Sequence, residues 1–156
     1  MTLKGDGTWK FTAEVIGYDI VLRDVVATCF GGGADPQDSG ETASGISTKK
    51  FPFLPAVSIP MDGRQFSTRS TAFHKALDGC PIPKLPFGML VQIETINGID
   101  YPDYTFPIID VGPARRTGNA LDLTIAAARM YAANASATNF RATVNFRILG
   151  AARFVR

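Results

Sequence analysis

Prolines constrain the fold of this 156-residue chain most strongly, because they recur throughout its middle third. Between positions 49 and 87 the chain carries prolines at 52, 55, 60, 81, 83 and 86. Each proline removes a backbone N–H donor and fixes φ, which excludes long helices and central strands there. We therefore expect loops and short edge strands in this stretch, with most of the sheet built by the segments on either side.

The flanking segments are rich in β-branched and aromatic residues, which favours strands. From Trp9 to Phe30 we expect two strands or one long bent strand. A strand over Met89–Ile96 leads into Asn97-Gly98, the strongest short signal for a hairpin, and Thr105–Asp110 then runs back. A last strand is expected within Phe140–Leu149, where apolar residues alternate.

Only one segment has the composition of a good helix. Thr124–Ala133 is alanine-rich and begins with a plausible threonine cap. The glycine-rich stretch from Gly31 to Gly40 is expected to be an irregular loop. It lacks the Gly-Lys-Ser/Thr that a phosphate cradle needs. Many short strands and one short helix predict a mainly β fold of the small-barrel type. No linker or repeat interrupts the chain, so we expect one domain over residues 1–156.

The rare residues exclude several kinds of site. With one histidine, His74, and two cysteines, Cys29 and Cys80, the chain cannot build a four-ligand zinc site or an iron–sulfur cluster. We expect no metal and no cofactor. A single Cys29–Cys80 disulfide is possible, with two buried free thiols as the alternative. If the protein does chemistry, carboxylates are the expected agents.

Charge and hydropathy exclude two classes of partner. Sixteen Lys and Arg against fourteen Asp and Glu give a net charge of +2, too small a bias to predict nucleic-acid binding. The longest apolar stretches, Asp19–Phe30 and Leu121–Ala133, are interrupted by charges and fall short of the roughly 20 residues that cross a bilayer. No secretory signal is recognisable at the N-terminus. The location stays open: inside the cell, carried by a phage, or outside after removal of a signal.

Two aspartates stand at positions suited to chemistry. Asp110 ends an apolar strand just before a Gly-Pro turn. Apolar neighbours raise the pKa of a carboxyl by disfavouring its charged form, which suits a general acid, although a turn-stabilising role is equally open. Asp122 lies just ahead of the expected helix, where a carboxylate would cap free N–H groups or brace a loop.

Four short motifs occur in an informative order. They are Thr42-Ala-Ser-Gly45, Leu85-Pro-Phe-Gly-Met-Leu-Val91, Ile109-Asp-Val-Gly-Pro113 and Gly118-Asn-Ala-Leu-Asp-Leu123. In this order they resemble the double-psi β-barrel of bacterial cell-wall proteins. That barrel is the 3D domain of resuscitation-factor-like proteins and MltA-type lytic transglycosylases, and the chain is also similar to RlpA. The resemblance covers residues 25 to 150. It implies a six-stranded double-psi β-barrel with one short helix and a long inserted loop.

The resemblance also implies an activity: cleavage of peptidoglycan glycan strands without water. Asp110 would protonate the glycosidic oxygen and then take the proton of the sugar's C6 hydroxyl, which closes a 1,6-anhydro ring. Asp122 matches a second family aspartate expected to orient the site. Thr42 would hold the sugar or Asp110 through its hydroxyl, and Ser44 belongs to the same substrate-binding loop.

The chain departs from the family pattern at two places. The family's first aspartate has no counterpart, since the comparable stretch, Ala56 to Pro60, contains no acid. Residues 61–84 form an apparent insertion, which could cap a groove or dock a partner. His74, in this insertion, matches a histidine before the Pro-Phe-Gly strand of RlpA. It is read either as a substrate-binding or as a merely hydrogen-bonded residue. Arg115 and Arg116 would meet peptide-stem carboxylates or simply be solvated.

Two other functions compete with glycan cleavage. The missing aspartate, the insertion and the absent signal favour a non-catalytic barrel that serves as a structural or glycan-binding part of a larger assembly such as a phage tail. Its partners would be other subunits of that assembly. An expansin-like or endoglucanase-like action on another polysaccharide would share the barrel and the single acid.

Overall fold

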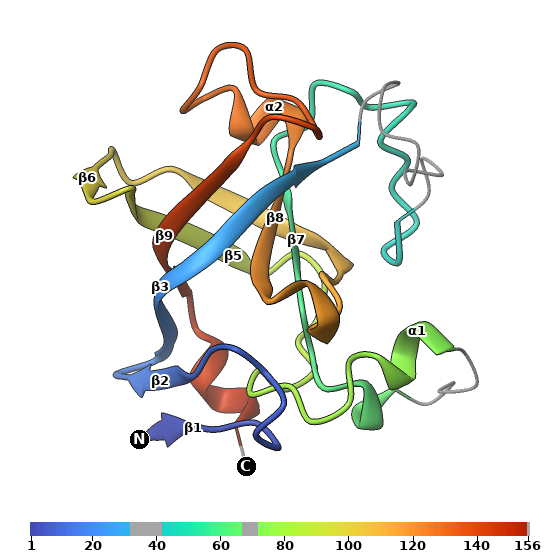
Figure 1. The fold of residues 1–156 in the computed structure, drawn as a ribbon, viewed down its shortest axis with the longest axis vertical. Coiled ribbons are helices and arrows are strands. Elements are labelled where there is room, and N and C mark those ends of the chain that lie inside the picture. The colour runs from blue at the N-terminus through green and yellow to red at the C-terminus, as the bar shows by residue number, and fades with distance from the viewer. Residues whose placement is uncertain (32–41, 67–71, 156) are drawn as a thin grey trace.

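The structure is a computed structural model that describes residues 1–31, 42–66 and 72–155 (Figure 1). The glycine-rich stretch expected to be a loop lies outside the described residues from position 32 onward. The strands are β1 (Thr2–Leu3), β2 (Ala13–Ile16), β3 (Asp19–Phe30), β4 (Val57–Ile59), β5 (Leu90–Ile96), β6 (Ile99–Asp100), β7 (Thr105–Val111), β8 (Asn119–Thr124) and β9 (Arg141–Ile148). The helices are α1 (Ala72–Lys75) and α2 (Ile125–Ala128), with 3-10 turns at Gly63–Gln65, Arg115–Thr117 and Ala151–Phe154.

Six of the strands close into a barrel. β3 pairs with β8, β8 with β4, β4 with β7, β7 with β5, β5 with β9, and β9 returns to β3. The β3–β8 and β4–β7 pairs are parallel and the other four are antiparallel. The predicted mainly β, six-stranded barrel is confirmed, although the described residues contain two short α-helices rather than one.

The strand order interlocks two connections. β8 lies between β3 and β4, which are neighbours in the sequence among the barrel strands, and β4 lies between β7 and β8. The gap between β3 and β4 is thus filled by β8, and the gap between β7 and β8 is filled by β4. Two such ψ-shaped units sharing β4 and β8 give the double-psi arrangement.

Alternation of buried and exposed residues explains the long strands. Along β9 every second residue from Ala142 to Ile148 is buried, as expected when one face of a strand packs on a core. β3 is bent by a bulge between Leu22 and Val25. There Asp24 takes a φ of 54°, and its N–H donates to Asn145 Oδ1 at 2.7 Å.

The Asn97-Gly98 turn joins β5 to β6. Both residues have positive φ, 51° and 80°, as a tight two-residue hairpin requires. The chain then returns along β7, which also pairs with β5. The predicted hairpin and its two long strands are therefore present.

The predicted helix is shorter than expected. Thr124 caps it as proposed, since its hydroxyl accepts a hydrogen bond from the Ala127 N–H, but α2 ends at Ala128. Ala127 and Ala128 are buried, whereas residues 129, 130 and 132–134 are exposed. Without an apolar face to pack, a short helix gains too little to extend.

A single hydrophobic cluster includes both the barrel and the 61–84 segment. Met61, Leu77, Ile82 and Leu85 of that segment are buried in the same cluster as the barrel strands. The N-terminal segment joins it through Trp9, whose Nε1 donates to the Asp78 carbonyl at 3.0 Å. The described residues of this segment and the N-terminal segment therefore share the core of the barrel, and together we call them the base of the barrel.

Both cysteines are buried and no disulfide joins them, so of the two alternatives the structure has the pair of buried thiols. Burial raises the pKa of the Cys80 thiol, which keeps it protonated. Among the described residues, no helix has the length and apolar character to cross a membrane.

Candidate functional site

Four polar side chains form one row across neighbouring strands. Ser58 of β4 pairs with Asp110 of β7 on one side and with Asp122 of β8 on the other. Asp122 in turn pairs with Thr28 of β3. Directly paired residues lie on the same face of a sheet, so the two predicted carboxylates stand one strand apart with Ser58 between them. Their Cα atoms are thus separated by two strand spacings, roughly 10 Å.

A bulge in β7 gives Asp110 its position. Val57 pairs with Ile108 but Ser58 pairs with Asp110, so Ile109 is the extra residue. In such a bulge two successive residues face the same side. Ile108 faces the core, while Ile109 lines a surface pocket beside Asp110.

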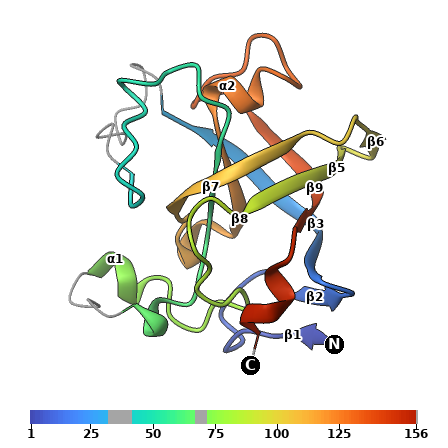
Figure 2. The same cartoon turned by 180° about the vertical axis from the view of Figure 1, so that it is seen from behind.

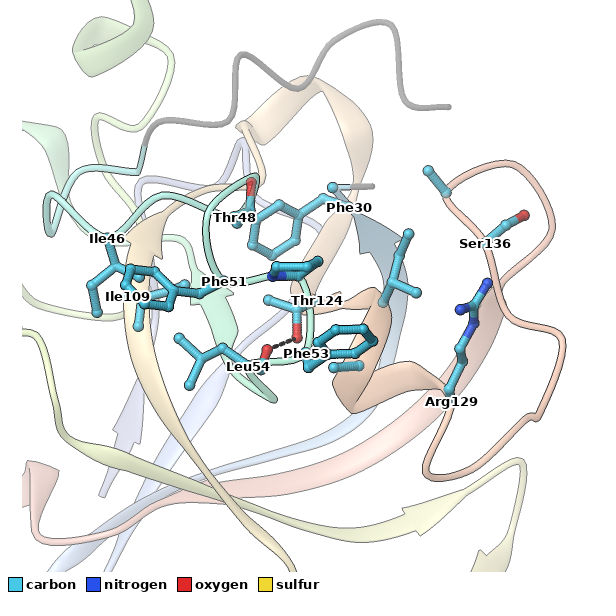
Figure 3. A pocket seen from close by; sticks show the side chains of 15 residues that line it. Phe30, Ile46, Thr48, Phe51, Phe53, Leu54, Ile109, Thr124, Arg129 and Ser136 are labelled. Atoms are coloured by element: carbon cyan, nitrogen blue, oxygen red, sulfur yellow. Dashed lines mark hydrogen bonds between the residues drawn. The ribbon is translucent and has the colours of Figure 1, made fainter. Parts of the chain in front are cut away.

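That pocket has a volume of about 630 Å³ and is mainly apolar (Figure 3). Figure 3 shows Phe51 beside Ile109, with Arg129 and Ser136 across the opening. Its walls come from the ends of β3 and β8, from α2 and from the 46–54 loop, with these lining residues: Phe30, Gly31, Ile46, Thr48, Phe51, Pro52, Phe53, Leu54, Ile109, Thr124, Ile125, Ala126, Arg129, Ser136 and Ala137.

The pocket begins one residue pair beyond the carboxylate row. On β3 the step from Thr28 to Phe30 leads into it, and on β8 the step from Asp122 to Thr124 does the same. Residues two apart on a strand share a face. The row and the pocket are therefore parts of one surface.

The Thr42-Ala-Ser-Gly45 loop folds against Asp110. The Ala43 N–H donates to Asp110 Oδ1 at 3.0 Å, the Val111 N–H donates to the same oxygen at 2.9 Å, and the Ser44 N–H donates to the Ile109 carbonyl at 3.1 Å. Backbone donors thus hold the half-buried carboxyl in place.

The hydroxyls of this loop have local partners. Thr42 Oγ1 lies 2.9 Å from Ser44 Oγ and donates to the Ile46 carbonyl at 2.7 Å. The contact with Asp110 that the resemblance gave to the Thr42 hydroxyl is made by the next residue's N–H instead. Hydrogen bonds within the loop thus fix its conformation, and its backbone N–H at Ala43 contacts Asp110.

Asp122 lies within β8, not at a helix end. The Thr28 hydroxyl donates to Asp122 Oδ1, and Asn119 Nδ2 donates to Thr28 Oγ1 at 3.4 Å. Thr124, two residues later, caps α2 in its place. A chain of polar side chains on β8 and β3 therefore orients this carboxylate.

Ser58 is a site residue that sequence reasoning missed. It comes from the Ala56–Pro60 stretch, which contains no acid, yet it stands between the two carboxylates. Its hydroxyl donates to the Gly112 carbonyl at 2.9 Å and is buried. A lone hydroxyl among buried apolar residues was the available signal.

The remaining predicted site residues are His74, Arg115 and Arg116. His74, in α1, stacks on Phe66 with ring centroids 5.0 Å apart. Arg115 turns toward the N-terminal segment: its Nη1 donates to the Asp78 carbonyl at 3.3 Å and lies 4.0 Å from Asp6 Oδ2. Arg116 is exposed on the surface. In this arrangement Arg115 braces the fold.

The 51–55 stretch places two aromatic residues at the pocket. The Phe51 and Phe53 side chains line the pocket while remaining 58% and 89% exposed. Large exposed apolar rings beside a cavity are available to a ligand or a partner. In the described part of the chain, no set of three or more His, Cys, Asp or Glu side chains is placed to hold a metal ion.

Neither known protein-family models nor curated protein sequences match this chain.

Proposed function

We propose that this protein cleaves peptidoglycan glycan strands as a lytic transglycosylase, with Asp110 as its acid and base. The observation that carries the proposal is the position of Asp110: a half-buried carboxyl in line with Asp122 and next to a pocket with exposed aromatic rings. Aromatic faces pack against the C–H faces of sugars, and a positioned carboxyl supplies the proton that a glycosidic oxygen needs.

The proposed reaction needs one carboxyl. Asp110 carries the transferable proton, and the Ala43 and Val111 N–H groups, which both donate to Oδ1, hold its carboxyl in a fixed orientation. Asp110 donates this proton to the glycosidic oxygen as the C1–O bond breaks. Asp110 then accepts the proton of the C6 hydroxyl while O6 bonds to C1. No water is consumed, and the acid is restored.

Asp122 has an orienting role in this proposal. Its negative charge, held by Thr28, lies on the same face as Asp110. A fixed negative charge stabilises the oxocarbenium character that develops at C1. Removing it should slow the reaction less than removing the proton donor.

Digestion of purified sacculi tests the proposal. Wild-type protein should release soluble fragments with 1,6-anhydro ends, identified by mass spectrometry. Asp110→Asn, which keeps the shape of the side chain but carries no transferable proton, should lower the rate roughly a hundredfold or more. Asp103→Asn is the matched control, because Asp103 is exposed and lies beyond β6, outside the row.

The products separate the alternatives. Fragments with ordinary reducing ends would mean hydrolysis, and release from cellulose instead of sacculi would favour the expansin-like or endoglucanase-like reading. Undiminished cleavage by Asp110→Asn, or no cleavage at all by wild-type protein, would contradict the proposal.

A structural role in a larger assembly is the second candidate, and the exposure of Phe51 and Phe53 favours it. Exposed apolar rings also mark protein–protein contacts. If sacculi stay intact, self-association measured by light scattering, and lost in a Phe51→Ser/Phe53→Ser variant, would support this second function.

A further inference from the structure

The inserted segment carries a third exposed aromatic ring next to the carboxylate row. Phe73 of α1 is 47% exposed. A methyl group placed on Gly112 would lie 3.7 Å from Phe73 Cζ and equally far from Ser58 Oγ. Gly112 follows Asp110 by two residues, so the ring stands beside the site.

Phe73 and the pocket lie on opposite sides of the acid. Along β7 and the turn after it, the order is Ile109 in the pocket wall, then Asp110, then Gly112 against Phe73. From Ile109 to Gly112, an extended chain spans roughly 10 Å. Figures 1 and 2 agree in placing the 42–56 segment and α1 on the same side of the barrel, toward its two ends.

α1 is fixed relative to the site. The Arg115 N–H donates to the Ala76 carbonyl at 3.2 Å, which ties the end of α1 to the turn after Asp110. Just after α1, the carbonyl of the buried Leu77 accepts a hydrogen bond from the Gly63 N–H at 3.1 Å. An exposed ring on an anchored backbone binds with little loss of conformational freedom.

The neighbouring side chains extend this aromatic surface. His74 lies beside Phe73 with ring centroids 6.1 Å apart and stacks on Phe66, and Lys84 Nζ lies 5.1 Å from the Phe66 centroid. Cation–π and stacking contacts hold such a row of rings in place.

We propose that Phe73 forms a sugar-binding subsite opposite the pocket, so that the glycan strand is bound on both sides of the bond to be cleaved. This inference rests on the proposed function. A strand that reaches Phe73 is held on both sides of Asp110, and strands too short to reach Phe73 are poorer substrates. The inserted segment then sets the preference for strand length.

Phe73→Ala tests the subsite, with Tyr18→Ala as its matched control. Tyr18 is an exposed aromatic residue in the β2–β3 turn, away from α1 (Figure 1). For long glycan strands, Phe73→Ala should raise KM roughly tenfold and leave kcat nearly unchanged. Phe73→Trp should restore the KM. The cleavage of the shortest substrates should change by less than twofold.

Binding in an inactive background keeps this test separate from catalysis. Added to Asp110→Asn, Phe73→Ala should reduce retention on insoluble sacculi, whereas Tyr18→Ala should not. If Asp110→Asn abolishes cleavage but Phe73→Ala behaves like Tyr18→Ala in both assays, the subsite is refuted while the proposed function stands. If Asp110→Asn cleaves normally, the proposed function is refuted, and the subsite proposal that rests on it is refuted with it. An unchanged thermal midpoint for Phe73→Ala excludes misfolding as the cause of a loss.

Discussion

Asp62 joins the two ends of the 61–84 segment. Its Oδ1 accepts hydrogen bonds from the Gly79 N–H at 3.2 Å and from the Arg64 N–H and Nε, and its Oδ2 pairs with Arg64 Nη2 at 2.8 Å. Burial alone would raise the pKa of this carboxyl, but the hydrogen bonds and charge of Arg64 outweigh it. The net result is a pKa below its ordinary value of 3.8.

This shift makes stability depend on pH at acid values. A carboxyl with a depressed pKa in the folded state stabilises that state above its unfolded pKa, and the contribution disappears as pH falls through the folded pKa. Asp62→Asn should therefore lower the free energy of unfolding at pH 7, by about 1–3 kcal/mol. Urea titrations at pH 7 and below pH 3.8 measure the difference.

The difference between wild type and Asp62→Asn should begin to shrink as pH falls through 3.8, and it should approach zero only below the depressed pKa of folded Asp62, where both side chains are neutral. Asp103→Asn, at an exposed position, should change stability little at either pH. A difference in the free energy of unfolding that stays constant with pH would mean that the charge of Asp62 contributes nothing to stability.

Residue patterns located the two carboxylates but not their neighbours. Asp110 stands out because it ends an apolar run before Gly-Pro, a feature visible in the sequence alone. Ser58 offers only a lone hydroxyl in an apolar stretch, and Phe73 carries no local signal. Ser58 joins the site only because β4 pairs with β7 and β8 together, and Phe73 only because α1 packs near Gly112.

At the scale of elements, Thr124 links β8, α2 and the segment before β4. Its Oγ1 accepts from the Ala127 N–H at 3.3 Å and from the Ala56 N–H at 3.0 Å. It also donates to the Leu54 carbonyl at 2.9 Å, the bond drawn in Figure 3. One hydroxyl thus satisfies three backbone groups beside the pocket.

Thr124→Val should lower the free energy of unfolding by about 2 kcal/mol or more, because it removes a helix cap and leaves buried backbone groups unpaired. Thermal or urea denaturation followed by circular dichroism measures the loss. The same change at the exposed Thr105, at the start of β7, should have little effect. Equal effects at both sites would show that the three hydrogen bonds are not decisive.

Element types were easier to predict than element lengths. The long strands and the Asn97-Gly98 turn follow from local alternation and backbone preference, which tertiary packing here reinforces. The helix was overestimated because alanine content measures propensity, whereas its length is set by how far the chain stays in contact with the barrel.

At the scale of the whole molecule, the single tryptophan reports on one cooperative unit. Trp9 is buried, in the same core cluster as the barrel strands and the 61–84 segment. Because these parts share one core, they should unfold together. Urea curves from Trp9 fluorescence and from far-ultraviolet circular dichroism should have the same midpoint. A fluorescence transition at lower urea would show that the base of the barrel opens separately.

The closed barrel could be predicted in kind but not in strand pairing. Local patterns give the number and type of strands, whereas the order β3–β8–β4–β7 depends on contacts between segments far apart in the chain. The resemblance supplied the double-psi expectation, and the pairings of β4 and β8 bear out that topology.

The interlocked strands bear on how the protein is made. The gap between β3 and β4 is filled by Asn119–Thr124, which leaves the ribosome some 60 residues after β4, and the ring closes only when Arg141–Ile148 joins β3 to β5. Until then the nascent chain exposes unpaired strand edges, the kind of surface that aggregates or recruits chaperones. Truncation before β9 should therefore yield insoluble chains rather than a smaller barrel.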